Sequence, residues 1–419
     1  MNACPRIRDY EDPGFDPFET FDRAGGLGEV EDPYPLFHEL HGIGRMRRGD
    51  IRSEFGLKPF ALWGELPSVM VFGADMVERV YWDGTTFSNA IMQRLYRDSF
   101  GESINGMDAP EHPRYRRLFQ RAFLPQTVAR WGEQLVPQVV NTIIDTFAAR
   151  GRAELVSEFT VEYPFRIIYR QLGLPEDDIE PFHRLAVGLM CIMIDYPHAL
   201  EASQKMGEYF HHLLEERRLH PGDDLVSTLA TAQIDGEQPP KAVTVSFLRQ
   251  LLNAAGDTTY RSTGSLLVGL LTNPDQLAAV RADRSLVPRA VDEALRWNGP
   301  LTVLTRQATR DVELEGLPIA NGTKIDVVQG SANRDPTRFT DPDRFDVLRP
   351  PGRHVAFAYG PHVCLGQHLA RLEMSRALNA LLDRLPNLRL DPDQPAPRIV
   401  GLNSRAPQAI HVLFDESSH

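Results

Sequence analysis

A single cysteine occupies a glycine-rich turn directly before a stretch with helical periodicity. Residues 357–366 read FAYGPHVCLG, and leucines recur at helical spacing after Cys364. A thiol at a helix N-terminus lies near the positive end of the helix dipole and near free backbone N–H groups, which favour the metal-binding thiolate. Gly360 and Gly366 permit sharp turns and leave room for a flat group, and Phe357 offers an aromatic wall. Cys364 is therefore a candidate metal ligand.

Three other interpretations of Cys364 stay open on these residues alone. A lone cysteine near a helix start is more often a small buried apolar residue. A zinc site that used Cys364 with His362 or His368 would need two further ligands, and the sequence has no second Cys/His pair nearby at matching spacing. A nucleophilic cysteine would need a positioned base, which a sequence does not reveal.

A carboxylate and a hydroxyl lie next to each other inside a long helical stretch. Residues 241–271 contain no proline and predict a helix of about thirty residues, well beyond the usual length. In its middle, residues 254–259 read AAGDTT, where glycine costs about 1 kcal/mol relative to alanine and adjacent threonines crowd the helix. A local opening beside Asp257 and Thr258 would suit the handling of dioxygen and protons. A harmless kink in the helix is the simpler alternative.

The chain that positions these groups is long and acidic. It has 419 residues, with 45 Lys+Arg against 57 Asp+Glu and a formal net charge of −12, which disfavours nucleic acid and anionic membrane surfaces as partners. Its three cysteines, Cys4, Cys191 and Cys364, are too few and too scattered for a disulfide framework. The sequence shows no signal peptide and no run of about 18 apolar residues. We expect a cytoplasmic protein without a membrane anchor.

The pattern along the chain is mainly helical, with a small portion of strands. The expected elements are an irregular lead-in over 1–30, a short helix in 33–40, a hairpin of 60–63 with 69–72, a helix over 74–82, a long loop over 84–107, mostly helix over 111–214, a helix over 222–233, the long helix, two helices over 273–283 and 288–297, short strands after Pro300, and a helix over 367–385.

The motif F-x-x-G-x-H-x-C-x-G around Cys364 resembles the haem-binding signature of the cytochrome P-450 superfamily, although Ala358 stands where that family usually has Gly or Ser. The resemblance covers nearly the whole chain in the same order. It implies one domain over 1–419, a mainly α fold with a small β portion, and a triangular helical prism that holds haem b between the long helix and the cysteine-bearing helix. It also implies that the Cys364 thiolate is the proximal iron ligand, with Phe357 and Gly366 beside the haem.

The same resemblance implies roles for the residues of the long helix and for several charged residues. Asp257 would be the acid of a proton relay, and Thr258 its hydroxyl partner. Glu293 and Arg296 alone would be an ordinary helical pair worth about 0.2–0.5 kcal/mol, but they match the family's E-x-x-R motif. With Arg349 they would form a structural network of three charges.

Other charged residues correspond to groups that bind the haem or the electron donor. By resemblance, the cationic groups that hold the haem propionates are His112, Arg116, Arg306 and His354. Arg117 and Arg121, on the same predicted helix as His112, would bind an acidic ferredoxin; alone they would be a solvated helix face.

The resemblance implies a haem-thiolate monooxygenase that activates O₂ with electrons from ferredoxin and ferredoxin reductase. We expect a monomer that hydroxylates a lipophilic molecule resembling a terpenoid, a steroid or a fatty acid. The expected substrate contacts are mostly apolar: Ile91, Leu95, Phe247, Leu251, Ala254, Val303, Leu304 and Leu402. Two alternatives remain, a peroxygenase or other non-monooxygenase haem-thiolate enzyme and a non-catalytic haem protein.

Overall fold

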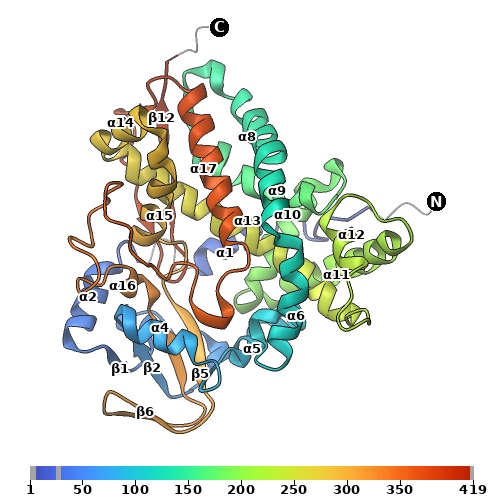
Figure 1. Cartoon of the computed structure of the whole chain (residues 1–419), viewed down its shortest axis with the longest axis vertical. Helices are drawn as coiled ribbons and strands as arrows, with labels where there is room; N and C mark the ends of the chain where they lie inside the picture. Colours follow the sequence, from blue (N-terminus) through green and yellow to red (C-terminus); the bar gives the residue numbers. More distant parts are fainter. Residues whose placement is uncertain (1–5, 25–29, 416–419) are drawn as a thin grey trace.

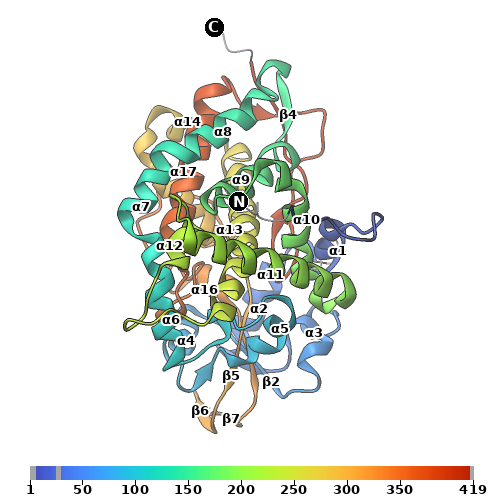
Figure 2. The same ribbon diagram turned by 90° about the vertical axis from the view of Figure 1, so that its right-hand side faces the viewer.

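The helix α13 (Lys241–Leu271) passes through the interior of the protein. The structure is a computed structural model, and it describes residues 6–24 and 30–415. Most residues along α13 are buried, which is typical of a helix that is apolar on nearly all sides. Other helices cover it in both ribbon views (Figures 1 and 2). The long helix predicted over 241–271 is therefore confirmed.

Helices form most of the structure, which confirms the expected mainly α fold with a small β portion. The helices other than α13 are α1 (Pro17–Ala24), α2 (Tyr34–Ile43), α3 (Ile51–Glu54), α4 (Ala74–Trp82), α5 (Gln93–Ser99), α6 (Glu111–Gln120), α7 (Pro125–Arg130), α8 (Val136–Asp145), α9 (Glu162–Gln171), α10 (Ile179–Gly188), α11 (Tyr196–Leu219), α12 (Leu225–Ala230), α14 (Pro274–Ala282), α15 (Val287–Trp297), α16 (Gln329–Asn333) and α17 (Gln367–Arg384).

A five-stranded sheet lies beside α4 at the lower end of the molecule in Figure 1. Its order is β1-β2-β8-β5-β3, with β2 and β8 parallel and the other pairs antiparallel. Val69 is in register with Ile325 and Val71 with Val327, and these side chains share a buried cluster with Val77 of α4. The cluster fixes α4 on the sheet. The strands are β1 (Met46–Arg48), β2 (Ser68–Val71), β3 (Phe87–Ser88), β5 (Leu304–Ala308) and β8 (Lys324–Val327).

Three smaller sheets complete the β portion. The strands β6 (Val312–Leu314) and β7 (Leu317–Ile319) form a hairpin, and β10 (Ile399–Val400) pairs with β11 (Ala406–Pro407). The strand β12 (His411–Leu413) lies between β4 (Arg152–Glu154) and β9 (Arg389–Leu390). Glu315 and Gly316 at the β6–β7 turn both have positive φ, as a two-residue hairpin turn of this type requires.

Several sequence expectations need correction. The lead-in is not wholly irregular, because α1 forms there and Asp16 caps it by accepting from the Phe18 and Glu19 N–H groups. The expected hairpin of 60–63 with 69–72 is wrong, since residues 61–63 form a 3₁₀ turn and β2 pairs instead with β1 and β8.

The loop expected over 84–107 also contains regular structure. It holds β3, α5 and 3₁₀ turns at 90–92 and 104–106. The helix expected over 222–233 is shorter and spans only α12. It begins at Leu225, because the Asp224 side chain caps it by accepting from the Ser227 N–H. Cys4 lies outside the described residues. Across residues 6–24 and 30–415, no helix is both long enough and apolar enough to cross a membrane.

Candidate active site

Two exposed residues mark an opening inside the fold. Ala254 is exposed although it lies in the middle of α13, where Leu251, Leu252 and Asn253 are buried. Cys364 is exposed at its surface, yet the surrounding protein desolvates its thiol and thereby raises the pKa. Since α13 packs against α17, we infer that both residues face one internal opening between α13 and the turn that carries Cys364.

The backbone around Cys364 only partly favours the thiolate. The Cys364 N–H donates to the Phe357 carbonyl at 2.9 Å, which closes the turn. Desolvation is the largest influence on the Cys364 pKa and raises it; the Gly366 and Gln367 N–H groups and the positive charge of Arg116 lower it by less. The helix-start effect expected from sequence is therefore present but outweighed. A bound cation would supply the charge that stabilises the thiolate.

The turn before Cys364 needs unusual backbone angles. Gly360 has φ +73°, and a Cβ on it would lie 2.8 Å from the Tyr81 carbonyl oxygen and 3.0 Å from Trp82 Cα. Ala358 also has a positive φ, +58°, although it is not glycine. A Cβ on Gly366 would meet nothing within 4 Å, so the space beside this residue is open, as a flat cofactor against the backbone requires.

Basic side chains from three parts of the chain meet beside the Cys364 turn. The rings of His112 (α6) and His362 stack with centroids 3.8 Å apart, and Arg116 Nη2 donates to the Val363 carbonyl at 2.6 Å. Arg306 (β5) is 5% exposed, and its guanidinium lies 5.0 Å from the ring centroid of Tyr81. Burial lowers the pKa of His112 to about 4 and that of His362 to about 2.

The charge of this basic cluster is not neutralised by the protein. Within the described part of the chain, no carboxylate lies within ion-pair distance of Arg116 or Arg306. Burial lowers the pKa of both guanidiniums. A buried cation is stable only when it is paired. The cluster therefore fits a ligand that brings carboxylates, and the two propionates of haem are such groups. Sequence reasoning missed His362 as part of this cluster, although the position lies inside the cysteine motif.

The structure places His354 differently from the other predicted haem-propionate residues. Its Nε2 lies 3.6 Å from Asp292 Oδ1, and its Nδ1 accepts from the Ala356 N–H at 3.3 Å. Asp292 also accepts from Arg371 Nε at 2.7 Å. His354 thus already has a carboxylate partner, and its role toward a cofactor stays a prediction. The guanidinium of Arg371 lies 4.5 Å from the ring centroid of Phe357, so this pairing supports the aromatic wall before Cys364.

Asp257 and Thr258 lie in a continuous stretch of α13 and face different neighbours. Thr258 Oγ1 donates to the Ala254 carbonyl at 2.9 Å, which satisfies the hydroxyl within the helix. Asp257 accepts from Arg261 Nε at 3.0 Å on both carboxylate oxygens. The structure shows no hydrogen bond between Asp257 and Thr258. Sequence reasoning missed Arg261, which follows Asp257 by one helical turn and could have been found by that spacing.

The structure brings the three predicted structural charges together. Glu293 accepts from Arg296 Nε and Nη2 at 2.8 Å and from Arg349 Nε at 3.1 and 3.2 Å. The Glu293 and Arg296 side chains are 5% and 3% exposed. Arg296 also donates to the carbonyls of Asn333, Pro342 and Arg344. This network fastens α15 to the irregular chain that leads into the Cys364 turn.

The predicted substrate contacts lie in different surroundings. Ala254 faces the opening, and Leu304 and Leu95 are half-buried. Leu95 also lines a cavity of about 140 Å³ with Met190 and Met193. Phe247 stacks on Phe119 at 3.8 Å and belongs to a core cluster together with Leu251. The remaining predicted contacts are buried: Ile91, Val303 and Leu402.

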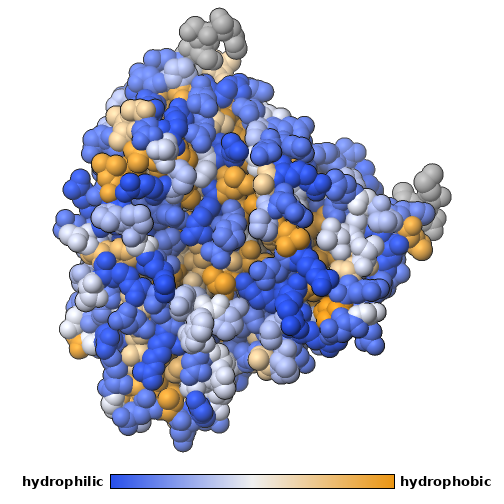
Figure 3. All heavy atoms as spheres, in the orientation of Figure 1, coloured by the Kyte–Doolittle hydropathy of each residue, from blue (hydrophilic) through white to orange (hydrophobic). Residues whose placement is uncertain are grey.

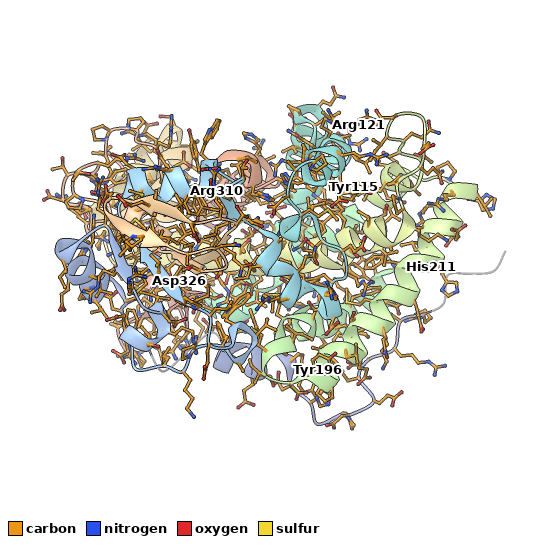
Figure 4. All side chains as sticks on the ribbon, turned by 90° about the horizontal axis from the view of Figure 1, so that it is seen from below. Tyr115, Arg121, Tyr196, His211, Arg310 and Asp326 are labelled. Carbon is orange, nitrogen blue, oxygen red and sulfur yellow. The ribbon has the colours of Figure 1, made fainter. Side chains whose placement is uncertain are left out.

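Three arginines project outward from α6 and from the 3₁₀ turn that follows it at residues 121–123. Arg114, Arg117 and Arg121 are exposed, whereas His112 and Leu118 on the same helix are buried. Hydrophilic side chains gather over this part of the molecule in Figure 3. Figure 4 places Arg121 and Tyr115 at the edge opposite Tyr196. The helix thus presents a positive surface to solvent and His112 and Arg116 to the Cys364 turn.

Comparisons with known proteins agree on one family. The cytochrome P450 family model matches residues 195–402. Cytochrome P450 133B1 of Xylella fastidiosa is 36% identical over 86% of this chain and 90% of that protein. A vitamin D3 dihydroxylase of Streptomyces griseolus is 39% identical over 69% of this chain and 71% of that protein. The structure of cytochrome P450 CYP109Q5 from Chondromyces apiculatus superimposes with a TM-score of 0.83 and 31% identity, covering 94% of this chain and 98% of that one.

Proposed function

The chain belongs to the cytochrome P450 family of haem-containing monooxygenases, and from this premise we propose that it hydroxylates a lipophilic small molecule in the opening between α13 and Cys364. The observation that carries the proposal is that this opening lies beside a largely buried basic cluster for whose arginines residues 6–24 and 30–415 provide no carboxylate partner. Together they fit a flat cofactor with two carboxylates. Cys364 would hold its iron, and His112, Arg116, Arg306 and His362 would hold its carboxylates.

The haem, when bound, supplies the oxygen chemistry: one atom of O₂ enters a C–H bond, and the other leaves as water after uptake of two electrons and two protons. The protein's own groups would bind and position the cofactor and the substrate. Ala254, the smallest side chain on its face of α13, leaves space beside the opening. Thr258 lies four residues further along that face, and its hydroxyl, which donates to the Ala254 carbonyl in this structure, would serve O₂ in the opening from there. Asp257 would hold the proton that this hydroxyl passes on.

Apolar surfaces in this part of the fold support a lipophilic substrate class. Leu304 is half-buried, and the separate cavity of about 140 Å³ is lined by Leu95, Met190 and Met193, which are apolar and adaptable. One relative acts on vitamin D3, a lipophilic molecule. A terpenoid, steroid or fatty-acid-like compound suits such a lining because its burial removes apolar surface from water.

Electrons would arrive from a ferredoxin and its reductase. The exposed arginines of α6 lie on the helix whose buried side contacts the Cys364 turn. A small acidic iron–sulfur protein that docked on this surface would therefore come close to the proximal side of the cofactor. Opposite charges would also speed the encounter at low salt.

A reduced, carbon-monoxide-bound absorption spectrum tests the central proposal. We expect the red-shifted Soret band of a thiolate-ligated haem in the wild type and its loss in Cys364→Ala. The matched control is Cys191→Ala, because Cys191 is buried in the core among apolar side chains and should leave the band unchanged. A haem-free wild type, or a band that persists in Cys364→Ala, would refute the assignment.

A ligand screen would then identify the substrate class. Terpenoids, steroids and fatty acids that displace solvent from the opening should shift the spin state of the haem iron. NADH-dependent turnover with ferredoxin would separate a monooxygenase from a peroxygenase. Reduction without any product across the whole library would instead support a non-catalytic haem protein.

A further inference from the structure

A second, larger cavity is lined by Asp257 but by none of the residues proposed to hold the cofactor. It has a volume of about 420 Å³ and lies between α1, α9, α10, α13 and β11. Neither Cys364 nor any member of the basic cluster lines it. Asp257 and Arg261 line it from α13, and Asp22 lines it from α1. In Figure 2, α1 and α10 lie side by side.

Arg261 is buried at the centre of this cavity wall. Its side chain is 1% exposed, and its Nη2 lies 3.0 Å from Asp257 Oδ1 and 3.7 Å from Asp22 Oδ1. In the described part of the chain, its Nη1 has no hydrogen-bond partner. A buried charged N–H group is normally paired with protein or ordered water. The unpartnered Nη1 therefore indicates that the cavity holds something that accepts a hydrogen bond.

The charges around Arg261 favour water as that occupant over an anion. Two carboxylates, Asp257 and Asp22, face the single guanidinium of Arg261, so a further anion would be repelled. Burial lowers the pKa of His183, which lines the cavity from α10, to about 4, so this ring is neutral near pH 7. The lining is mixed, with apolar residues such as Phe18 and Phe165 beside the polar groups Asp22, Asp257 and Arg261. A cavity of this volume has room for several water molecules along its polar side.

The cavity also reaches the solvent. The Asp22 side chain is 48% exposed, and Gln408, another lining residue, is exposed as well. Asp257 is 11% exposed and lies at the inner end. A file of water molecules could thus connect bulk solvent at Asp22 with the carboxylate that the relay uses.

We propose that this cavity is the route by which solvent protons reach Asp257, and that Asp22 on α1 is the carboxylate that takes them up at its mouth. The inference rests on the proposed role of Asp257. In each turnover Asp22 would pass a proton through water to Asp257 and regain one from solvent, so its own protonation state is restored. Asp22 is a positioning residue, because it acts through Asp257.

The surroundings of Asp22 support proton uptake. Burial raises its pKa; Arg261 acts to lower it, and Asp257 and Asp16 raise it. Tyr260 of α13 also lines the cavity, and burial raises its pKa, so this phenol stays neutral. The net effect on Asp22 is a carboxyl group that exchanges protons closer to neutral pH than an exposed aspartate does.

The test uses the holoenzyme with NADH, ferredoxin reductase and ferredoxin, and it follows O₂ consumption, which needs no known substrate. Asp22→Asn should slow the reaction roughly tenfold and enlarge its solvent deuterium isotope effect. Asp22→Glu should restore most of the rate, because it retains a carboxylate. Gln408→Trp, which narrows the mouth without altering a charge, should act in the same direction as Asp22→Asn. Glu180→Gln removes an exposed carboxylate of α10 and serves as the control.

A high-resolution crystal structure of the holoenzyme gives a second readout. We expect ordered water between Asp22 and Asp257, with one molecule accepting from Arg261 Nη1. An empty or closed cavity, or unchanged isotope effects in both Asp22→Asn and Gln408→Trp, would overturn the inference. Asp257→Asn separates the two ideas. If it slows the reaction while the other two variants do not, only the entry route fails; if it too has no effect, the proposed role of Asp257 fails.

Discussion

The geometry of the turn before Cys364 predicts that a substitution at Gly360 destabilises the protein. Replacing it by alanine forces a left-handed backbone on an L-residue, φ +73°, at about 1–2 kcal/mol. The new Cβ would also lie 2.8 Å from the Tyr81 carbonyl oxygen and 3.0 Å from Trp82 Cα. These are backbone atoms of α4, so the strain cannot be relieved by rotating a side chain, and overpacking of this kind costs about 1–3 kcal/mol. The lower entropy of the unfolded alanine chain offsets about 0.4–1 kcal/mol.

The net effect of Gly360→Ala should be a loss of about 3 kcal/mol in the free energy of unfolding. Urea titrations followed by circular dichroism and by the thiolate-type Soret band would measure it. Gly236→Ala is the matched control, because Gly236 also has a positive φ, +86°, but a Cβ there would meet nothing within 4 Å. It should cost only about 1 kcal/mol.

A second variant in the same turn should shift stability in the opposite direction. Ala358→Gly removes the left-handed alanine, φ +58°, and should stabilise the protein by about 0.5 kcal/mol after the added unfolded-state entropy. If Gly360→Ala costs no more than Gly236→Ala, then α4 can move away from the turn freely. The reasoning from the two backbone contacts would then be refuted.

Other variants test the charged groups. Glu293→Gln leaves the buried guanidinium of Arg296 and the half-buried guanidinium of Arg349 without their carboxylate. It should lower the free energy of unfolding by about 3–5 kcal/mol in urea titrations, and a loss below about 1 kcal/mol would show that the network is not needed. Arg117→Glu should slow reduction by ferredoxin several-fold at low salt and less at high salt, whereas Arg218→Glu on α11 should not; equal rates in stopped-flow measurements would contradict docking on α6. Burial lowers the pKa of His183 to about 4, so the unfolded chain binds a proton there from about pH 6.5 downward and stability falls as pH falls. His183→Phe should reduce the loss of unfolding free energy between pH 7 and pH 5 by about 2 kcal/mol, and an unchanged pH dependence would exclude a buried neutral ring.

The elements that could be predicted from sequence are those whose signals are local. The bounds of α13 and α4 follow from apolar periodicity and from stop signals next to them in the chain. The partner of β2 could not be predicted, because β1 is three residues long and largely polar, and the pairing with β8 joins distant segments. A short helix such as α5 shows too few periods to be recognised.

In the candidate site, too, only the features with a local sequence signal could be predicted. Cys364, Asp257 and Glu293 lie in motifs that can be recognised residue by residue. Pairings between elements could not be recognised. His354 has Asp292 as its partner, and Asp257 is held by an arginine one turn away rather than by Thr258. The partner that each of these side chains has depends on which other side chains the tertiary fold brings within reach.

The parallel pairing of β2 with β8 also determines when the cofactor pocket can form during protein synthesis. The two strands are roughly 250 residues apart, and a ribosome needs about 10–50 s to synthesise that length. Until then β2 has an unpaired edge, and α4 lacks the turn that Gly360 presses against it. A nascent chain that ended after α13 would have Asp257 but no ligand for iron. A cofactor that needs Cys364 can therefore be captured only after most of the polypeptide has been synthesised.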